Sequence, residues 1–229
     1  INPKIRDRMR KLLFSLLQIG MFGILPAQTF TEWQDPQTNA VNRLPMRAAY
    51  FAYESTEKAA IADKTASTRF LSLDGTWRFN WARHADMRPT GFFRTDYDDK
   101  AWSSMPVPGM WELNGYGDPL YVTEGYAWSD QAPKEPPVVP VEENHVGPYR
   151  RWIELPDTWS GQQIIAHIGS ATSNLYLWVN GRFAGYSEDS KLPAEFDITR
   201  FLKPGRNLLA MQVFRWADGS YLEDQDLFR

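Results

Sequence analysis

The chain contains no cysteine among its 229 residues, so no disulfide bond stabilises its fold. A membrane anchor attached through a cysteine is excluded for the same reason. Histidine occurs only at His84, His145 and His167, which are too scattered along the sequence to indicate a metal site. His167 alternates with apolar residues, so we expect it to have a structural role within a strand.

Motifs of the common catalytic sites are absent as well. The chain has no G-x-S-x-G nucleophile motif, no H-E-x-x-H zinc motif, no P-loop and no G-x-G-x-x-G dinucleotide motif. A membrane-spanning helix is not predicted either, because the apolar run at residues 12–25 has 14 residues where about 20 are needed. The motifs therefore identify no catalytic residue in this chain.

The first 27 residues have the pattern of a secretory signal. Arg10 and Lys11 follow Met9 and precede the apolar run, while Leu25 and Ala27 suit the −3 and −1 positions of a signal-peptidase site. We therefore predict a signal peptide from Met9 to Ala27, preceded by residues upstream of the true start. The mature protein is expected in the periplasm or the medium. The alternative is an amphipathic or core helix, for which the polar side of the run is thin.

The charge of the mature chain excludes two kinds of partner. Removal of residues 1–27 takes away five basic residues and one acidic residue, which changes the formal charge from −3 to −7. Such an acidic chain argues against binding to nucleic acid or to an anionic membrane. Hydrophobic residues make up 43% of the sequence and aromatic residues 14%, enough to fill a core, so disorder is not expected for most of the chain.

The mature part shows the pattern of many short strands. Apolar and polar residues alternate in "TWRFNWA" (76–82) and "YRRWIEL" (149–155), as in half-buried strands. Asn180-Gly181 fits a type I′ hairpin turn, and Pro204-Gly205 indicates another turn. "LLAMQVFRW" (208–216) is apolar on both faces, so we expect a strand covered on both sides. These patterns predict an all-β fold, an antiparallel sandwich of the jelly-roll kind.

An extended arm is predicted before this sandwich. Pro36 and Pro45 interrupt residues 28–65, and "ESTEKAAIADK" (54–64) predicts a short helix capped by Ser55. The predicted domains are therefore residues 1–27 with the signal, the arm at 28–65, and the sandwich at 66–229.

A long proline-rich connection runs from residue 103 to residue 147, and loops of this length are commonly functional. Its aromatic residues can either stack on sugar rings or pack on the sheet, and the sequence leaves both open. They are Trp111, Tyr116, Tyr121, Tyr126 and Trp128. In contrast, strand spacing predicts that Trp77, Trp81 and Trp178 mainly fill the core.

Four carboxylates gather near the end of the chain, at Asp218, Glu223, Asp224 and Asp226. Such a run is commonly a solvated turn, and its spacing does not fit an EF-hand. Adjacent strand residues point to opposite faces, so Asp224 and Asp226 can share a face whereas Glu223 and Asp224 cannot. Two carboxylates on one face favour a hard cation. The alternatives are therefore a surface turn and an oxygen-rich, cation-assisted binding site.

"RWADGSYLEDQDLFR" (215–229) closely resembles the end of the sugar-binding domain of glycoside hydrolase family 2 β-galactosidases. The sequence "LEDQD" within it is similar to galactosidases rather than to glucuronidases and mannosidases of the same fold. Further matching blocks follow in the family's order: residues 32–48, 70–82, 105–121, 144–151 and 178–199. The resemblance implies a galactose-binding-like jelly roll, of which the last strand would follow Arg229.

The resemblance also implies an activity and a second domain. The whole protein would be a retaining β-galactosidase that hydrolyses terminal non-reducing β-D-galactose residues. A (β/α)₈ barrel beyond Arg229 would hold both catalytic glutamates, so the chain alone would be inactive. The implied partners are β-galactoside sugars and this barrel of the same polypeptide, with a homo-oligomer left open and no membrane after signal removal.

Two site residues follow from the resemblance. Asp226 matches an aspartate that contacts a galactose hydroxyl and serves as a sodium ligand, with the other sodium ligands, and any magnesium site, in the barrel. Glu223 and Asp224 are assigned to holding the loop. Thr123 stands where many relatives carry a sugar-binding asparagine, so it is the second candidate for substrate binding. Its hydroxyl is shorter and lacks the paired groups of an amide.

Two other hypotheses compete with this interpretation. An independent carbohydrate-binding module is suggested by the aromatic residues at 111–128. A truncated product without function is the other, because a missing last strand would leave a ladder unpaired and lower the solubility.

Overall fold

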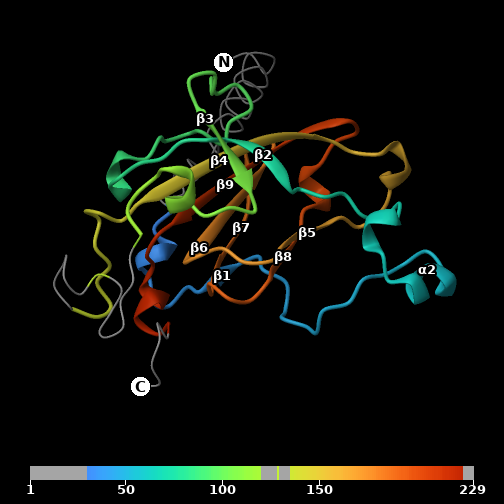
Figure 1. The fold of residues 1–229 in the computed structure, drawn as a ribbon, viewed down its shortest axis with the longest axis horizontal. Helices are drawn as coiled ribbons and strands as arrows, with labels where there is room; N and C mark the ends of the chain where they lie inside the picture. The colour runs from blue at the N-terminus through green and yellow to red at the C-terminus, as the bar shows by residue number, and fades with distance from the viewer. Residues whose placement is uncertain (1–29, 120–127, 129–134, 224–229) are drawn as a thin grey trace, which may run out of the picture. The chain divides into compact units, whose positions relative to one another are not determined.

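The computed structural model describes residues 30–119, 128 and 135–223 (Figure 1). The predicted signal peptide, Thr123 and Asp226 lie outside these residues, as does the position of a last strand. Where the chain is described, none of its helices has the length and apolar character needed to cross a bilayer.

The described strands form two antiparallel sheets. The larger sheet has the spatial order β1-β7-β6-β9-β4-β2-β3, and β5 pairs with β8 in the second sheet. In chain order the strands are β1 (Ala40–Val41), β2 (Gly75–Phe79), β3 (Ser103–Val107), β4 (Val146–Glu154), β5 (Ile165–Ile168), β6 (Asn174–Val179), β7 (Arg182–Glu188), β8 (Ala194–Asp197) and β9 (Arg206–Phe214).

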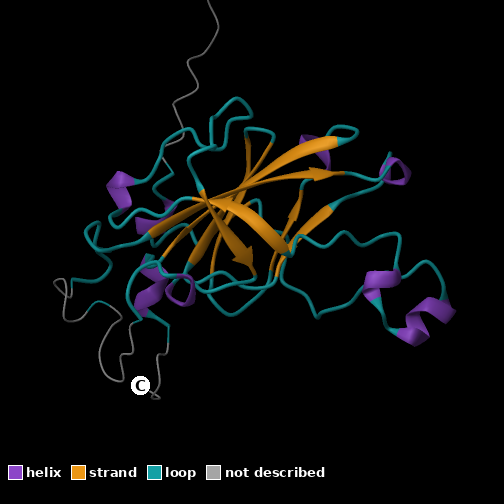
Figure 2. Cartoon of the chain, turned by 45° about the horizontal axis from the view of Figure 1, so that its top comes forward, coloured by secondary structure: helices purple, strands orange, loops and turns teal. Residues whose placement is uncertain are grey.

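Helical structure is short and lies around the strands (Figure 2). The α-helix α2 (Thr56–Ile61) is the one predicted in the arm, and the backbone N–H of Lys58 donates to the Ser55 hydroxyl at 3.3 Å, as expected for a capping serine. The 3₁₀ turns are η1 (Glu32–Gln34), η2 (Lys64–Ala66), η3 (Ala85–Met87), η4 (Glu112–Asn114), η5 (Asp157–Trp159), η6 (Thr199–Phe201) and η7 (Asp218–Tyr221).

The main core lies between the two sheets. Alternate residues of the long strands point into it, and residues of β5 and β8 cover them from the other side. The sheets approach closely at Gly185, where a Cβ atom would lie 2.4 Å from the Phe196 ring. The core is formed by Trp77, Phe79, Met105, Tyr149, Ile153, Leu175, Leu177, Val179, Leu209, Met211 and, from the second sheet, Ala166, Ala194 and Phe196. This packing confirms the predicted all-β antiparallel sandwich.

The turns and the central strand agree with the sequence predictions. Asn180 and Gly181 have φ angles of 51° and 82°, the two positive values that a type I′ turn requires between β6 and β7. Gly205 has a φ of 71°, which fits the left-handed position of the second turn. Strand β9 pairs with β4 on one edge and β6 on the other. Successive residues of β9 are buried, so both of its faces are covered as predicted.

The outer face of the larger sheet is covered by irregular segments. Trp178 lies under the rings of Phe92 and Phe93, with centroid distances of 5.3 and 5.1 Å. Trp33 of the arm stacks on Phe214 at 4.8 Å. The predicted arm also contributes β1, which pairs with β7 at the sheet edge, while the domain boundary at residue 66 stays a prediction.

Candidate functional site

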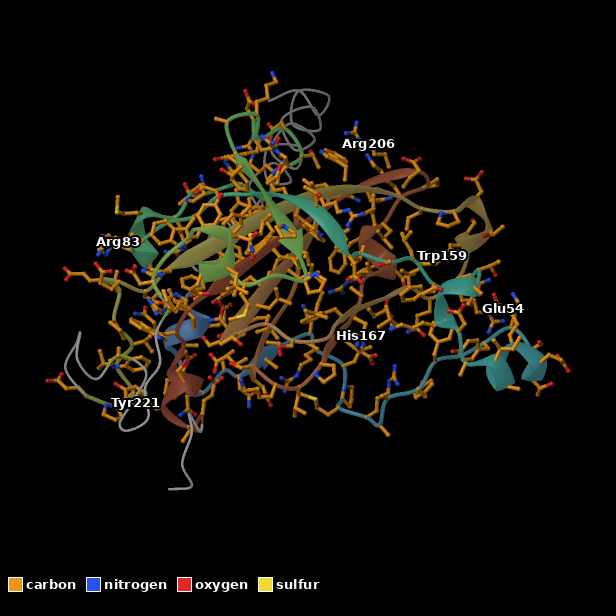
Figure 3. All side chains as sticks on the ribbon, in the orientation of Figure 1. Glu54, Arg83, Trp159, His167, Arg206 and Tyr221 are labelled. Atoms are coloured by element: carbon orange, nitrogen blue, oxygen red, sulfur yellow. The ribbon has the colours of Figure 1, made fainter. Side chains whose placement is uncertain are left out.

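The described segments that lead to Thr123 and Asp226 meet at one end of the sandwich. Arg83 and Tyr221, labelled in Figure 3, mark this end. The connection after β3 enters here and comes back to β4, and the segment after β9 ends here. We call this region the loop end, and three contacts join the two segments here.

Arg215 forms the first contact between the two segments. Its Nη2 donates to the carbonyl oxygen of Asp118 at 3.3 Å, and its Nη1 lies 3.3 Å from Nδ1 of His145. Gly117 packs on the same ring, because a Cβ atom there would lie 2.8 Å from His145 Nδ1. The backbone at Gly117 and Asp118 therefore packs on two side chains next to the central strands. Arg215 directly follows β9, and the other side chain, a histidine, directly precedes β4.

The electrostatics of this contact favour a neutral histidine. Burial, followed by the charge of Arg215, lowers the pKa of His145 to about 4. A neutral imidazole can accept a hydrogen bond from Arg215. Burial also lowers the pKa of Arg215, while the charges of Glu112, Asp118 and Glu143 oppose the change. An arginine remains charged under these conditions, so the loop end holds a half-buried cation.

An aromatic cluster forms the second contact. The Trp128 ring is buried, with its centroid 5.4 Å from that of Trp216 and 4.6 Å from that of Tyr221. The Tyr221 hydroxyl donates to the carbonyl oxygen of Val138 at 2.7 Å. Residues on the far side of Thr123 therefore pack directly on the segment that leads to Asp226.

Asn144 forms the third contact. Its side chain is buried and pairs with both backbone groups of Trp216, since Nδ2 donates to the carbonyl oxygen at 3.1 Å and Oδ1 accepts from the N–H at 2.9 Å. This arrangement replaces strand pairing beyond the end of the β4–β9 ladder, where the backbone of residue 216 would otherwise lack partners.

The terminal acidic residues separate into different roles. The Glu223 carboxylate accepts from the hydroxyl of Ser190 and, at 3.4 Å, from its N–H, which confirms that Glu223 holds the loop. Asp218 lies beside Glu188, a partner that sequence reasoning missed because thirty residues separate them. Asp224 and Asp226 lie outside the described residues.

Most of the aromatic residues of the connection that are described pack inward. The indole N–H of Trp111 donates to the Tyr149 hydroxyl, and the Tyr116 ring lies 4.9 Å from that of Phe79. Trp111 and Trp128 are buried and present no free ring face for a sugar, whereas Tyr116 is half-buried against the core. Tyr121 and Tyr126 lie outside the described residues.

The remaining candidates from the sequence have structural positions. Trp77 and Trp178 are buried, on opposite faces of the larger sheet, and Trp81 packs against the core. The His167 side chain is 53% exposed and pairs with the Glu195 carboxylate at 3.0 Å, so it is a surface residue of the second sheet.

The described residues contain no group of three or more His, Asp or Glu side chains that could hold a metal ion. The predicted sodium ligand, Asp226, is not among them, so no reaction step is assigned to sodium. An open depression of about 320 Å³ lies at the opposite end of β6 and β7, where Arg94 approaches the turn at Gly181. Its lining residues are Thr90, Gly91, Arg94, Asp96, Tyr97 and Asp98.

Comparison with known proteins gives one family. The family model described as "Glycosyl hydrolases family 2, sugar binding domain" matches residues 70–229. A β-galactosidase of Priestia megaterium is 40% identical over 205 residues, which is 89% of this chain and 20% of the relative. A β-galactosidase of Enterobacter cloacae is 40% identical over 200 residues, 86% of this chain and 18% of the relative. The chain thus spans about a fifth of the length of these relatives.

Solved structures show a weaker likeness. A β-glucuronidase of Bacteroides uniformis has 23% identity and a TM-score of 0.47, over 63% of this chain and 14% of that one.

Proposed function

Because the chain belongs to the sugar-binding domains of glycosyl hydrolases family 2, we propose that it is the amino-terminal part of a retaining β-galactosidase. The names and the roughly 40% identity of the curated relatives support galactose as the sugar. The catalytic glutamates belong to the remaining four fifths of such a protein. This chain contributes a binding loop and no catalytic residue.

One observation carries the proposed role of the loop end. Arg215 contacts Asp118, and Trp128 contacts Trp216, so the segments that lead to Thr123 and Asp226 are joined at their bases. Two loops that are fixed together can present groups to one ligand. We propose that the Asp226 carboxylate accepts a hydrogen bond from a galactose hydroxyl and that the Thr123 hydroxyl adds a weaker contact.

The proposal extends to ions, partners and location. Asp226 supplies one oxygen ligand to sodium, and the catalytic part supplies the others and any magnesium site. The catalytic barrel and β-galactoside sugars are the proposed partners, in a protein that can assemble from several copies. Export to the periplasm or the medium, after removal of residues 1–27, is proposed from the basic and apolar pattern of the amino terminus.

An independent carbohydrate-binding module is less well supported. Such modules bind sugar on exposed aromatic faces, whereas Trp111 and Trp128 are buried. Calorimetric titration of the chain with galactose tests this alternative. We expect no heat of binding at millimolar sugar, and measurable binding would favour the module.

A chimeric enzyme tests the main proposal. Residues 32–229 would replace the matching segment of the Priestia megaterium β-galactosidase, and hydrolysis of an aryl β-galactoside would be measured. We expect an active chimera, because the family interface is retained. The change Asp226→Asn should lower kcat/KM by about 10–100-fold, the effect of losing a charged hydrogen bond.

The matched control is Asp98→Asn, which changes the same chemical group on the exposed loop before β3. We expect this variant to keep full activity. Equal activity of the Asp226→Asn chimera and its parent would remove Asp226 from the proposed site.

A further inference from the structure

Glu188 and Asp218 form a carboxyl pair on the outer face of the larger sheet. Glu188 ends β7 and is 6% exposed, and Asp218 begins η7. The two carboxyl groups lie close enough to interact, and burial raises the pKa of each. Gly219 permits this approach, because a Cβ atom there would lie 2.8 Å from Oε2 of Glu188.

The remaining polar atoms of the pair have few partners. The Tyr186 hydroxyl donates to Oε1 of Glu188. Oδ1 of Asp218 is buried and has no hydrogen-bond partner within the described residues. Two carboxylates placed side by side, one buried and one partly buried, repel each other when both are ionised unless a proton or a cation lies between them. The described residues around them provide no third acidic or histidine ligand for a cation.

The surrounding charges also favour a proton. Asp35, at the end of η1, adds a negative charge that raises the pKa of Asp218 further, after burial. The nearby cation, Arg43, donates to the carbonyl oxygen of Glu188 at 3.2 Å and to the Ser187 hydroxyl at 2.9 Å, rather than to a carboxylate of the pair. Burial and the neighbouring Asp218 raise the pKa of Glu188 to about 8.

More distant ionisable groups do not supply a positive charge to the carboxyl pair. The Tyr176 hydroxyl, on the adjacent strand β6, donates to Glu32 of η1 at 3.0 Å. Arg88 lies over the Phe214 ring, 5.3 Å from its centroid, and donates to the carbonyl oxygen of Ala85. These groups are engaged with other partners.

We propose that Glu188 and Asp218 share one proton and form a latch that holds residues 218–223 on the loop end near neutral pH. When the proton is lost to solvent, the buried Glu188 carboxylate faces the partly buried Asp218 carboxylate, and their repulsion loosens η7. The bonds of Tyr221 to Val138 and of Glu223 to Ser190 do not use this proton, so the expected change is local. The latch requires neither sugar nor the catalytic part, so it goes beyond the proposed function.

The raised pKa of Glu188 determines how the free energy of unfolding changes with pH. In the unfolded chain a glutamate ionises near its ordinary pKa of about 4.3, whereas the pKa of Glu188 in the folded chain is about 8. The folded state therefore binds one proton more between these values. Its stability is highest on the acid side and falls as the pH rises, with the unfolding constant increasing up to about tenfold for each pH unit.

A site-directed spin label reads the latch directly. The chain has no cysteine, so Leu222→Cys, at a residue that is 91% exposed, gives a unique attachment point beside η7. Electron paramagnetic resonance of this nitroxide, measured from about pH 6 to about pH 9, should show its mobility increasing through the pKa of the pair. A label at Leu113→Cys, 81% exposed on η4, should show no such change.

The change Glu188→Gln removes the titratable proton and keeps the shape of the side chain. Its amide can donate to Asp218 at every pH, so the label at residue 222 should become independent of pH. The matched control, Glu142→Gln, alters an exposed glutamate and should leave the pH change intact. If Glu188→Gln fails to fold by far-ultraviolet circular dichroism, Asp218→Asn replaces it and should shift the midpoint to lower pH.

Three results would overturn the latch. One is a label at residue 222 whose mobility does not depend on pH in the parent chain. Another is the same pH dependence after Glu188→Gln or Asp218→Asn. The third is loss of the pH change when sodium or calcium is added at constant ionic strength, which would show that a cation joins the carboxylates. None of these results depends on whether the protein cleaves galactosides.

Discussion

The two faces of the larger sheet are covered in different ways. The inner face packs on β5 and β8 through side chains that alternate along regular strands. The outer face is covered by the arm, the loop before β3 and the segment after β9. Aromatic contacts, such as that of Trp33 with Phe214, join them to the sheet, together with hydrogen bonds from buried polar side chains to backbone. Arg150 shows the difference most clearly, since its guanidinium donates to the carbonyl oxygens of Phe92 and Arg94 and to the Asp99 carboxylate.

The outer face and the loop end are the parts of the fold that can carry functional segments. Regular packing on the inner face fixes the strands, and irregular segments on the outer face and at the loop end are held by aromatic contacts and by a few polar residues. Loops of this kind vary more easily than strands and carry binding residues. The proposed sugar-binding segments are irregular segments of this kind. Substitutions at their polar contacts should therefore loosen these segments and leave the strands of the inner face intact.

The largest effect is expected for Arg150→Ala on the outer face. The Arg150 side chain is 2% exposed, and its removal leaves Asp99 and at least two carbonyl oxygens without their partner. We expect a loss of about 3–5 kcal/mol in the free energy of unfolding, measured by urea denaturation. The control, Arg94→Ala, removes an exposed guanidinium paired with Asp96 and should leave the midpoint of urea denaturation almost unchanged.

Asn144→Ala should have the next largest effect, at the loop end. It leaves the buried N–H and carbonyl groups of Trp216 unpaired, and we expect a loss of about 1–3 kcal/mol in the free energy of unfolding. Hydrogen exchange should show the loss of protection at Trp216, while the β6–β7 hairpin stays protected. If both regions lost protection equally, the loop end would not be a separately anchored unit.

Gly185→Ala tests the inner face. The new Cβ would lie 2.4 Å from the Phe196 ring and 2.7 Å from the carbonyl oxygen of Val41, so the second sheet must move. Overpacking of this kind costs about 1–3 kcal/mol, which thermal unfolding can measure. Adding Phe196→Leu should recover part of the loss, whereas Phe93→Leu, on the outer face, should not.

The smallest effect is expected for Ser55→Ala, which lies on neither face. The variant removes the cap of α2 and should cost about 0.5–2 kcal/mol of local helix stability. Because no residue of α2 is buried, global unfolding should hardly change. A large drop in the melting temperature would show that the arm helix supports the sandwich more than its exposure indicates.

Much of the inner face could be predicted from the sequence, because its strands and turns are specified by patterns of neighbouring residues. Alternation placed Trp77 and Phe79 toward the core, and Asn180-Gly181 identified a hairpin turn whose φ angles are as required. Ser55 was likewise recognisable as a helix cap. Each of these predictions depends on neighbours within a few residues.

The outer face and the loop end could not be predicted in the same way. Glu188 and Asp218 are paired by the fold across thirty residues, and neither has a local pattern that indicates a buried carboxyl. His167 alternates with apolar residues, but its side chain lies on the exposed side of β5. The function of Asp226 came from resemblance to a family, because one carboxylate in an acidic run does not reveal what it binds.

A crystal structure of the chimeric enzyme with a bound galactoside tests the central claim most directly. The account predicts that the Asp226 carboxylate lies about 2.5–3.0 Å from a galactose hydroxyl, at the end where Trp128 packs on Trp216 and Tyr221. An Asp226 side chain turned toward bulk solvent, with the sugar and every bound ion out of reach, would contradict it.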